Sequence, residues 1–174
     1  AFYSGGKLML WEGGKNRNRK VDHYGNNTTL GGTGEAGYSG DGGPALAAEL
    51  NGTFGLTIDA AGNIYFIEVN NSVARKIDTS GIITTVAGNG QEAFSGDNDL
   101  AISARLSSPT SVAVDRAGDL YISDSGNGRI RLVTTDGNIS SVVTGLKAAN
   151  GGGPKGLALD AAGNLEIAHT GARL

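Results

Sequence analysis

Three aspartates recur at equivalent places in the chain and could supply a carboxylate cluster. Asp59, Asp115 and Asp160 each lie at the end of a predicted strand, three residues before a glycine. Carboxylates held close together can act as general acids and bases. Aspartate side chains in such places also hydrogen-bond backbone groups two residues further on and so cap turns. We expect these three residues to cap hairpin turns rather than to catalyse a reaction.

Two glycine-rich segments offer oxygen atoms that a calcium ion could use. Residues 39–43 read Ser-Gly-Asp-Gly-Gly, and residues 95–99 read Ser-Gly-Asp-Asn-Asp. Asp97 and Asp99 have the alternating spacing of calcium ligands, but the other positions of a calcium loop do not follow. Gly43 also replaces the second carboxylate in the first copy. We therefore expect structural loops and assign no cofactor, with calcium left open as an alternative.

Other signals for catalysis or for nucleic-acid binding are weak. The chain has no cysteine, its only histidines are His23 and His169, and no serine lies in a nucleophile-elbow motif. Arg19, in the only basic cluster, recurs as Arg75 and Arg131 at one repeat position, so we expect these arginines to pair with acidic residues on neighbouring strands. The net charge of −3 gives no general attraction for nucleic acid or for anionic membranes. We expect no nucleic-acid partner, and no apolar run approaches the roughly 18 residues that span a bilayer.

The elements that position these residues belong to an internal repeat. Residues 32–87 align with residues 88–143 without a gap, and 18 of the 56 positions are identical. Residues 156–165 match residues 111–120 at a shorter offset of 45. A fixed period of this size indicates stacked supersecondary units.

Within each repeat, apolar and polar residues alternate over four short runs. The runs cover residues 54–59, 64–68, 73–77 and 82–87 in one unit, and residues 110–115, 120–124, 129–133 and 138–143 in the next. Such runs, separated by Gly, Asn, Asp and Ser, indicate antiparallel strands. The 30 glycines among 174 residues argue against a helical bundle. The sequence therefore predicts an all-β fold of four-stranded antiparallel sheets.

Two segments between the sheets have a helical composition. Residues 44–50 begin with Pro-Ala-Leu, and residues 100–106 are their counterpart. Proline at a first helical position followed by Ala and Leu predicts a short helix of two turns. We divide the single domain, residues 1–174, into blade units at residues 1–52, 53–108, 109–153 and, as a partial unit, 154–174.

Several of these segments resemble the NHL repeat of β-propellers. The resemblance is carried by Asp-Ala-Ala-Gly-Asn-Ile-Tyr at residues 59–65 and Asp-Ser-Gly-Asn-Gly-Arg-Ile-Arg at residues 124–131. Together with residues 38–45 and 83–90, they closely resemble the long-insert NHL repeats of bacterial, usually exported proteins. The resemblance covers nearly the whole chain and implies four-stranded blades around a central channel, an extracellular or periplasmic location, and binding on one face.

Family propellers generally close with about six blades, whereas this chain supplies about three and a half. We expect the ring to be completed by oligomerisation or by sequence outside these residues. The expected function is a non-catalytic binding or scaffold module that contacts a protein or a small ligand through loops between strands.

The candidate contacts are Tyr38, Asp41, Phe94 and Asp97, which occupy equivalent places on the two insert loops. The two aromatic residues could instead pack the loops onto the blades. The alternatives are a self-assembling structural subunit joined through exposed sheet edges, and a metal-assisted hydrolase or lyase that uses the propeller channel.

Overall fold

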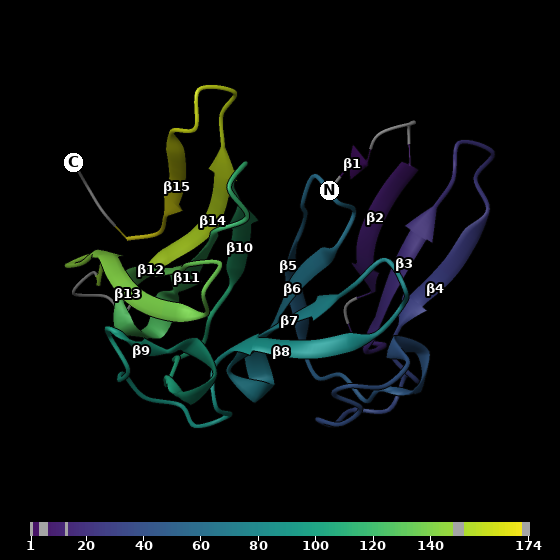
Figure 1. The fold of residues 1–174 in the computed structure, drawn as a ribbon, viewed down its shortest axis with the longest axis horizontal. Coiled ribbons are helices and arrows are strands. Elements are labelled where there is room, and N and C mark those ends of the chain that lie inside the picture. Colours follow the sequence, from purple (N-terminus) through teal and green to yellow (C-terminus); the bar gives the residue numbers. More distant parts are fainter. Residues whose placement is uncertain (1, 4–6, 13, 148–151, 172–174) are drawn as a thin grey trace.

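A computed structural model of the chain describes residues 2–3, 7–12, 14–147 and 152–171. These residues form antiparallel sheets that stand side by side like the blades of a fan (Figure 1). The first sheet contains β1 (Phe2–Tyr3), β2 (Lys7–Glu12), β3 (Arg17–Val21) and β4 (Asn27–Gly31). The second contains β5 (Thr53–Ile58), β6 (Ile64–Glu68), β7 (Val73–Ile77) and β8 (Ile83–Ala87).

The third sheet repeats this arrangement and gains a short fifth strand. It contains β10 (Ser111–Val114), β11 (Leu120–Asp124), β12 (Arg129–Val133) and β13 (Asn138–Val143), with β9 (Asp99–Leu100) on its outer edge. The described part of the fourth sheet is the hairpin of β14 (Pro154–Leu159) and β15 (Leu165–His169). The inner strands β5, β10 and β14 contact one another in series, and the sheets do not close into a ring. The predicted all-β fold of four-stranded sheets is confirmed.

Successive side chains of β6 point to opposite faces of the second sheet, and both faces are covered. Ile64 and Phe66 belong to a core shared with the first sheet, whereas Tyr65 and Ile67 belong to a core shared with the third sheet. Because side chains alternate along a strand, a strand buried on both faces needs apolar residues at every position. The Ile-Tyr-Phe-Ile run therefore joins three blades into one structure.

The two insert segments form shorter helices than the sequence predicts. Each contains a single 3-10 turn, η1 (Ala45–Ala47) and η3 (Ala101–Ser103), in place of two α-helical turns. After η1 the chain becomes extended at Ala48, and Ala45, Ala48 and Leu50 are all fully buried between the first two blades. A helix this short is marginal by itself, so burial of these three side chains decides the conformation. Two further 3-10 turns, η2 (Val69–Asn71) and η4 (Ser125–Asn127), follow β6 and β11.

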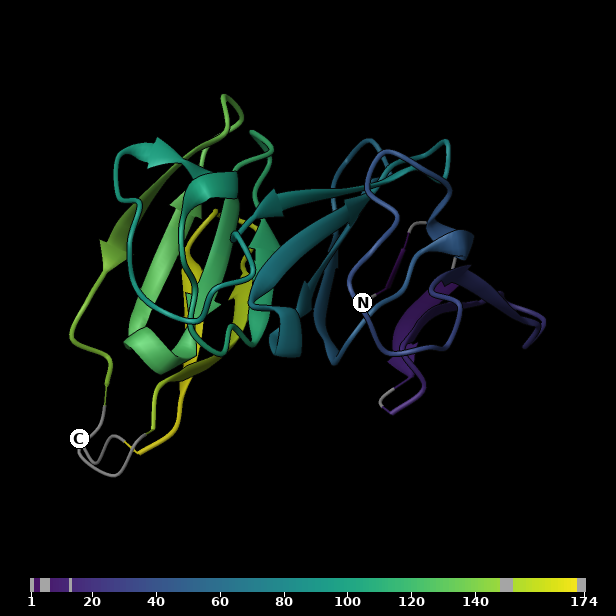
Figure 2. The same ribbon diagram turned by 90° about the horizontal axis from the view of Figure 1, so that it is seen from below.

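Each insert loop covers the outer edge of the blade that follows it. The Gly42 N–H donates to the Ile83 carbonyl over 2.8 Å, and the Ile83 N–H donates to Gly43 over 3.0 Å. In the next repeat, β9 pairs with β13. This pairing satisfies backbone groups that an open sheet edge would expose. Both insert loops lie at the same end of the sheets, the lower end in Figure 1, and they cross that end in the view from below (Figure 2).

Candidate protein-interaction surface

A buried arginine fixes the first insert loop to the second blade. The Arg75 side chain, on β7, is fully buried and pairs with the equally buried Glu68 of β6 at 3.0 Å. Its other terminal nitrogen contacts Asp41 at 2.7 Å and donates to the Ser39 carbonyl over 2.9 Å. Arginine presents its donors in a planar fork, so one side chain can satisfy a blade carboxylate and the loop together.

The same arrangement occurs one repeat later. Arg131, on β12, pairs with the buried Asp124 at 3.3 Å and with Asp97 of the second insert loop at 2.9 Å. In the first blade, Arg19 lies 3.7 Å from Glu12. The predicted pairing of the three repeat arginines with acidic residues on neighbouring strands is confirmed.

The buried carboxylates of these clusters carry a desolvation cost. Burial raises the pKa of Glu68, although the Arg75 charge and the hydrogen bonds from Asn51 and Asn71 act in the opposite direction. Burial likewise raises the pKa of Asp124, against the bonds from Ser107 and the charge of Arg131. Removing one partner of such a pair leaves an uncompensated charge in the interior. Because separating the partners would leave such a charge, the ion pairs keep the insert loops attached to the blades.

Tyr38 and Phe94 stack on these arginines and remain half exposed. The Tyr38 ring lies 5.2 Å from the Arg75 guanidinium carbon, and its hydroxyl group is 2.8 Å from the Thr85 hydroxyl group. The Phe94 ring lies 5.0 Å from the Arg131 guanidinium carbon and 4.0 Å from that of the partly exposed Arg129. The exposed fractions are 47% for Tyr38 and 41% for Phe94. Each ring therefore packs its loop onto the blade and also presents surface to solvent.

Asp41 and Asp97 lie beside these rings and are only partly covered. Their side chains keep 43% and 30% of their surface exposed while they pair with Arg75 and Arg131. The four candidate contacts thus form two equivalent groups, one on each insert loop.

Further apolar side chains, which the sequence reasoning missed, are exposed on the same loops. They are Leu46, Leu100 and Ile102. Leu46 and Ile102 occupy equivalent positions of the repeat, which is the signal that could have revealed them. We call the surface formed by Tyr38, Leu46, Phe94, Leu100 and Ile102 the insert face. The two insert loops that carry it lie at the end of the sheets that Figure 2 views from below.

The three repeat aspartates at the opposite end of the sheets cap hairpin turns, as predicted. Asp115 accepts hydrogen bonds from the N–H groups of Ala117 and Asp119, at 2.9 and 3.0 Å. Asp160 accepts the equivalent bonds, and Asp59 accepts from Asn63. Such bonds stabilise the ionised form, and they lower the pKa of Asp160.

The segment considered for calcium uses its carboxylates in other ways. Asp97 pairs with Arg131 and accepts a hydrogen bond from Ser141, and Asp99 accepts one from the Leu100 N–H. Across the residues that the structure describes, no three His, Cys, Asp or Glu side chains gather where they could hold a metal ion. Within the same residues, no helix has the length and apolar character needed to cross a membrane.

The arrangement of the sheets defines the class of protein. Four-stranded antiparallel sheets stand side by side with their inner strands in contact, which is the architecture of a β-propeller. The Teneurin NHL domain family matches residues 14–94, and the NHL repeat family matches residues 106–131. The chain is an NHL-repeat β-propeller.

Curated relatives come from the teneurins. Residues of this chain are 38% identical to Teneurin-1 from Homo sapiens over 109 residues, which is 55% of this chain and 4% of that protein. Teneurin-4 from Homo sapiens is 34% identical over 102 residues, which is 51% of this chain and 4% of the relative. The chain thus spans only a small part of the curated relatives it matches.

Solved structures share the fold at low sequence identity. A protein of unknown function from Bacteroides thetaiotaomicron superposes with a TM-score of 0.69 and 21% identity, over 93% of this chain and 41% of that chain. A streptogramin B lyase superposes with a TM-score of 0.67 and 20% identity, over 96% of this chain and 46% of the lyase chain. A chain of a nidogen/laminin complex superposes with a TM-score of 0.64 and 18% identity, over 93% of this chain and 52% of that chain. At these identities, the similarity shows the fold alone.

Proposed function

We propose that this chain is a non-catalytic protein-interaction module and that it binds a partner protein through the insert face. The observation that carries the proposal is the pair of half-exposed aromatic rings, Tyr38 and Phe94, which pack on the buried Arg75 and Arg131 side chains at 5.2 and 5.0 Å. Aromatic side chains are enriched among the residues that dominate binding energy at protein interfaces. Exposed apolar residues on the same two loops, Leu46, Leu100 and Ile102, add to the apolar area that the loops present to solvent.

The ion pairs give this surface a defined shape before any partner arrives. Binding through a mobile loop costs free energy, because the loop loses conformational entropy when it becomes ordered. Here Arg75 and Arg131 already hold the loops, and Ala93 N–H donates to the Leu106 carbonyl over 3.2 Å within the second loop. The two carboxylates Asp41 and Asp97 would lie at the polar rim of the contact. This preorganisation favours a binding role.

We also propose an extracellular location. The resemblance of residues 59–65 and 124–131 to the NHL repeats of exported proteins supports it. Self-association of copies of this chain through the same surface is one form that the partner could take.

The test measures binding of the purified chain to a panel of recombinant extracellular domains by surface plasmon resonance. The panel includes a second copy of the chain. We expect at least one partner to bind, and the double variant Tyr38→Ser/Phe94→Ser to weaken that binding at least tenfold. The matched control is Ala61→Arg/Ala117→Arg, two exposed positions in hairpin turns at the other end of the sheets. Binding that survives the first variant and is lost in the second would overturn the proposal.

A further inference from the structure

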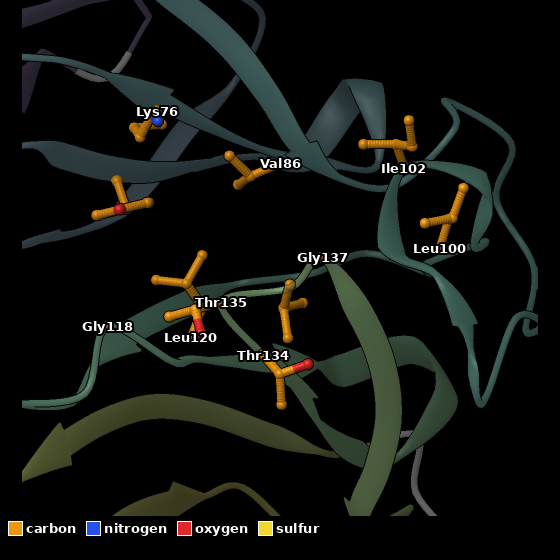
Figure 3. Close-up of a pocket in the computed structure, with 11 residues that line it drawn as sticks. Lys76, Val86, Leu100, Ile102, Gly118, Leu120, Thr134, Thr135 and Gly137 are labelled. Carbon is orange, nitrogen blue, oxygen red and sulfur yellow. The ribbon is translucent and has the colours of Figure 1, made fainter.

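A groove of about 350 Å³ separates the second and third blades next to the insert face. Its apolar wall contains Val86, Leu120 and Val133, and Leu100 and Ile102 of the insert loop form its rim. In Figure 3, Lys76 and Val86 lie on one side and Gly118, Leu120, Thr134 and Thr135 lie across from them. Lys76 and the exposed Leu100 are at opposite ends of the labelled set.

Lys76 supplies the charge of the groove. Among the described residues that line it, Lys76 is the one that carries a full charge at neutral pH. Burial and the nearby Asp59 carboxylate raise the pKa of Tyr65 to about 12, so this phenol stays neutral. The Lys76 side chain is partly buried, and its ammonium group has no hydrogen-bond or ion-pair partner in the described part of the chain. An ammonium group in a groove with an apolar wall is complementary to a carboxylate attached to an apolar group.

Carboxylates next to the lining residues in the sequence are already engaged, and Asp59 accepts hydrogen bonds from Asn63 and Tyr65. Asp119 accepts a hydrogen bond from the Thr135 N–H over 2.9 Å. Asp136 accepts hydrogen bonds from the Thr134 hydroxyl group and from the Asn138 side chain. Neither carboxylate lines the groove. A carboxylate from outside is therefore the natural counterion for Lys76.

We propose that this groove binds an extended peptide segment of a partner protein, with a large apolar side chain on the Val86–Leu120 wall and an adjacent carboxylate at Lys76. The proposal rests on the proposed protein-binding function and names the chemistry of the partner. The volume lies at the small end of the roughly 300–1,000 Å³ typical of ligand pockets, which fits one anchoring side chain and its neighbour rather than a large cofactor. Hydroxyl groups of Thr134 and Thr135 can bond the peptide backbone.

The preceding blade interface contains an equivalent groove that serves as an internal comparison. There Lys20 replaces Lys76, Leu30 replaces Val86, and Ile64 replaces Leu120. However, Asp78 stands where the other groove has Thr134, so this groove already contains a carboxylate. An acidic peptide should therefore select the groove between the second and third blades.

The experiment selects peptides from a random 12-residue phage library on the immobilised chain. We expect enrichment of sequences that place Asp or Glu within two residues of Leu, Phe or Trp. A synthetic copy of an enriched peptide is then measured by fluorescence anisotropy. Lys76→Glu should weaken its binding at least tenfold, Thr134→Asp should weaken it severalfold, and Lys20→Glu should leave it unchanged. A peptide with Lys in place of the acid should regain affinity for the Lys76→Glu variant.

Three results would overturn the inference: no enrichment of acidic apolar peptides, equal effects of Lys76→Glu and Lys20→Glu, or no rescue by the charge-reversed peptide. Circular dichroism spectra of each variant confirm that the fold is retained. The groove proposal and the proposed function of the insert face can be disproved independently of each other. A partner whose binding survives Lys76→Glu but is lost in Tyr38→Ser/Phe94→Ser supports the insert face and contradicts the groove.

Discussion

Arg75 and Asp41 form an ion pair of 2.7 Å although they are 34 positions apart in the sequence. The pair joins the middle of a blade to a loop that starts in the preceding blade. Since Arg131 and Asp97 repeat the contact at 2.9 Å, the feature belongs to the repeat rather than to one loop. The insert loops are therefore fixed parts of the propeller, and their aromatic side chains have defined positions.

Arg75→Met should strongly destabilise the fold. The substitution leaves Glu68 buried without its charged partner, which costs about 3–5 kcal/mol in comparable pairs. Urea denaturation followed by circular dichroism measures the change. The matched control Arg105→Met removes an exposed arginine of the second insert loop and should change the free energy of unfolding by less than about 0.5 kcal/mol. Equal losses in the two variants would contradict a structural role for the buried pair.

Asp97→Ala should loosen the second insert loop without unfolding the blade. Asp97 is partly exposed, so the loss of its ion pair should cost only about 1 kcal/mol. Hydrogen exchange should become faster at the N–H groups of Asn89 and Ala93, which bond to Ala104 and Leu106 within the loop. Exchange in β11 and β12 should stay slow, and faster exchange throughout the third sheet would show that Asp97 supports the blade itself.

Much of the fold could be predicted from the sequence because the strands follow local patterns. The predicted runs at residues 64–68 and 120–124 coincide with β6 and β11. The pairing of Arg75 and Arg131 with acidic residues also followed from the repeat, since unrelated surface charges would not recur at one position. The insert helices were predicted too long, because the conformation of residues 44–50 depends on burial of Ala48 and Leu50 between two blades rather than on local propensity.

Asp59→Asn should lower stability at neutral pH but not in acid. Burial disfavours the ionised form, but hydrogen bonds from Asn63 and Tyr65 outweigh it and lower the pKa of Asp59. A lowered pKa in the folded state stabilises the fold above the ordinary aspartate value of about 3.9, and this contribution disappears as the pH falls through the folded-state pKa. Thermal unfolding is measured from pH 2 to pH 7. The difference in melting temperature between the wild-type chain and Asp59→Asn should become smaller as the pH falls. Glu35→Gln, at an exposed loop position, serves as the control.

Gly88→Ala should be far more damaging than Gly81→Ala. Both glycines have positive φ, +89° and +82°, so alanine is strained at either position by about 1–2 kcal/mol. A Cβ atom at Gly88 would lie 2.3 Å from the Ser72 carbonyl oxygen, whereas one at Gly81 meets nothing within 4 Å. We expect total losses of about 3–4 kcal/mol for Gly88→Ala, because overpacking adds to the strain. Chemical denaturation measures the free energy of unfolding of both variants. Similar losses of stability in the two variants would mean that the backbone around Gly88 adjusts to the added Cβ atom.

The binding surface was harder to predict than the fold. Tyr38 and Phe94 stood out as aromatic residues at equivalent loop positions, but the sequence did not show that they stack on Arg75 and Arg129. The groove at Lys76 depends on two blades meeting, and residues distant in the sequence line it. A repeat alignment compares positions within one unit, so it does not reveal sites that form between units.

The most direct test of the central claim is hydrogen exchange of the chain with and without a partner found in the binding panel. The claim is that the insert face is the contact surface. We therefore expect slower exchange in residues 32–52 and 88–106 of the complex, with the hairpin turns at residues 59–63 and 115–119 unchanged. Protection confined to the hairpin turns, with unchanged exchange in both insert loops, would contradict the claim.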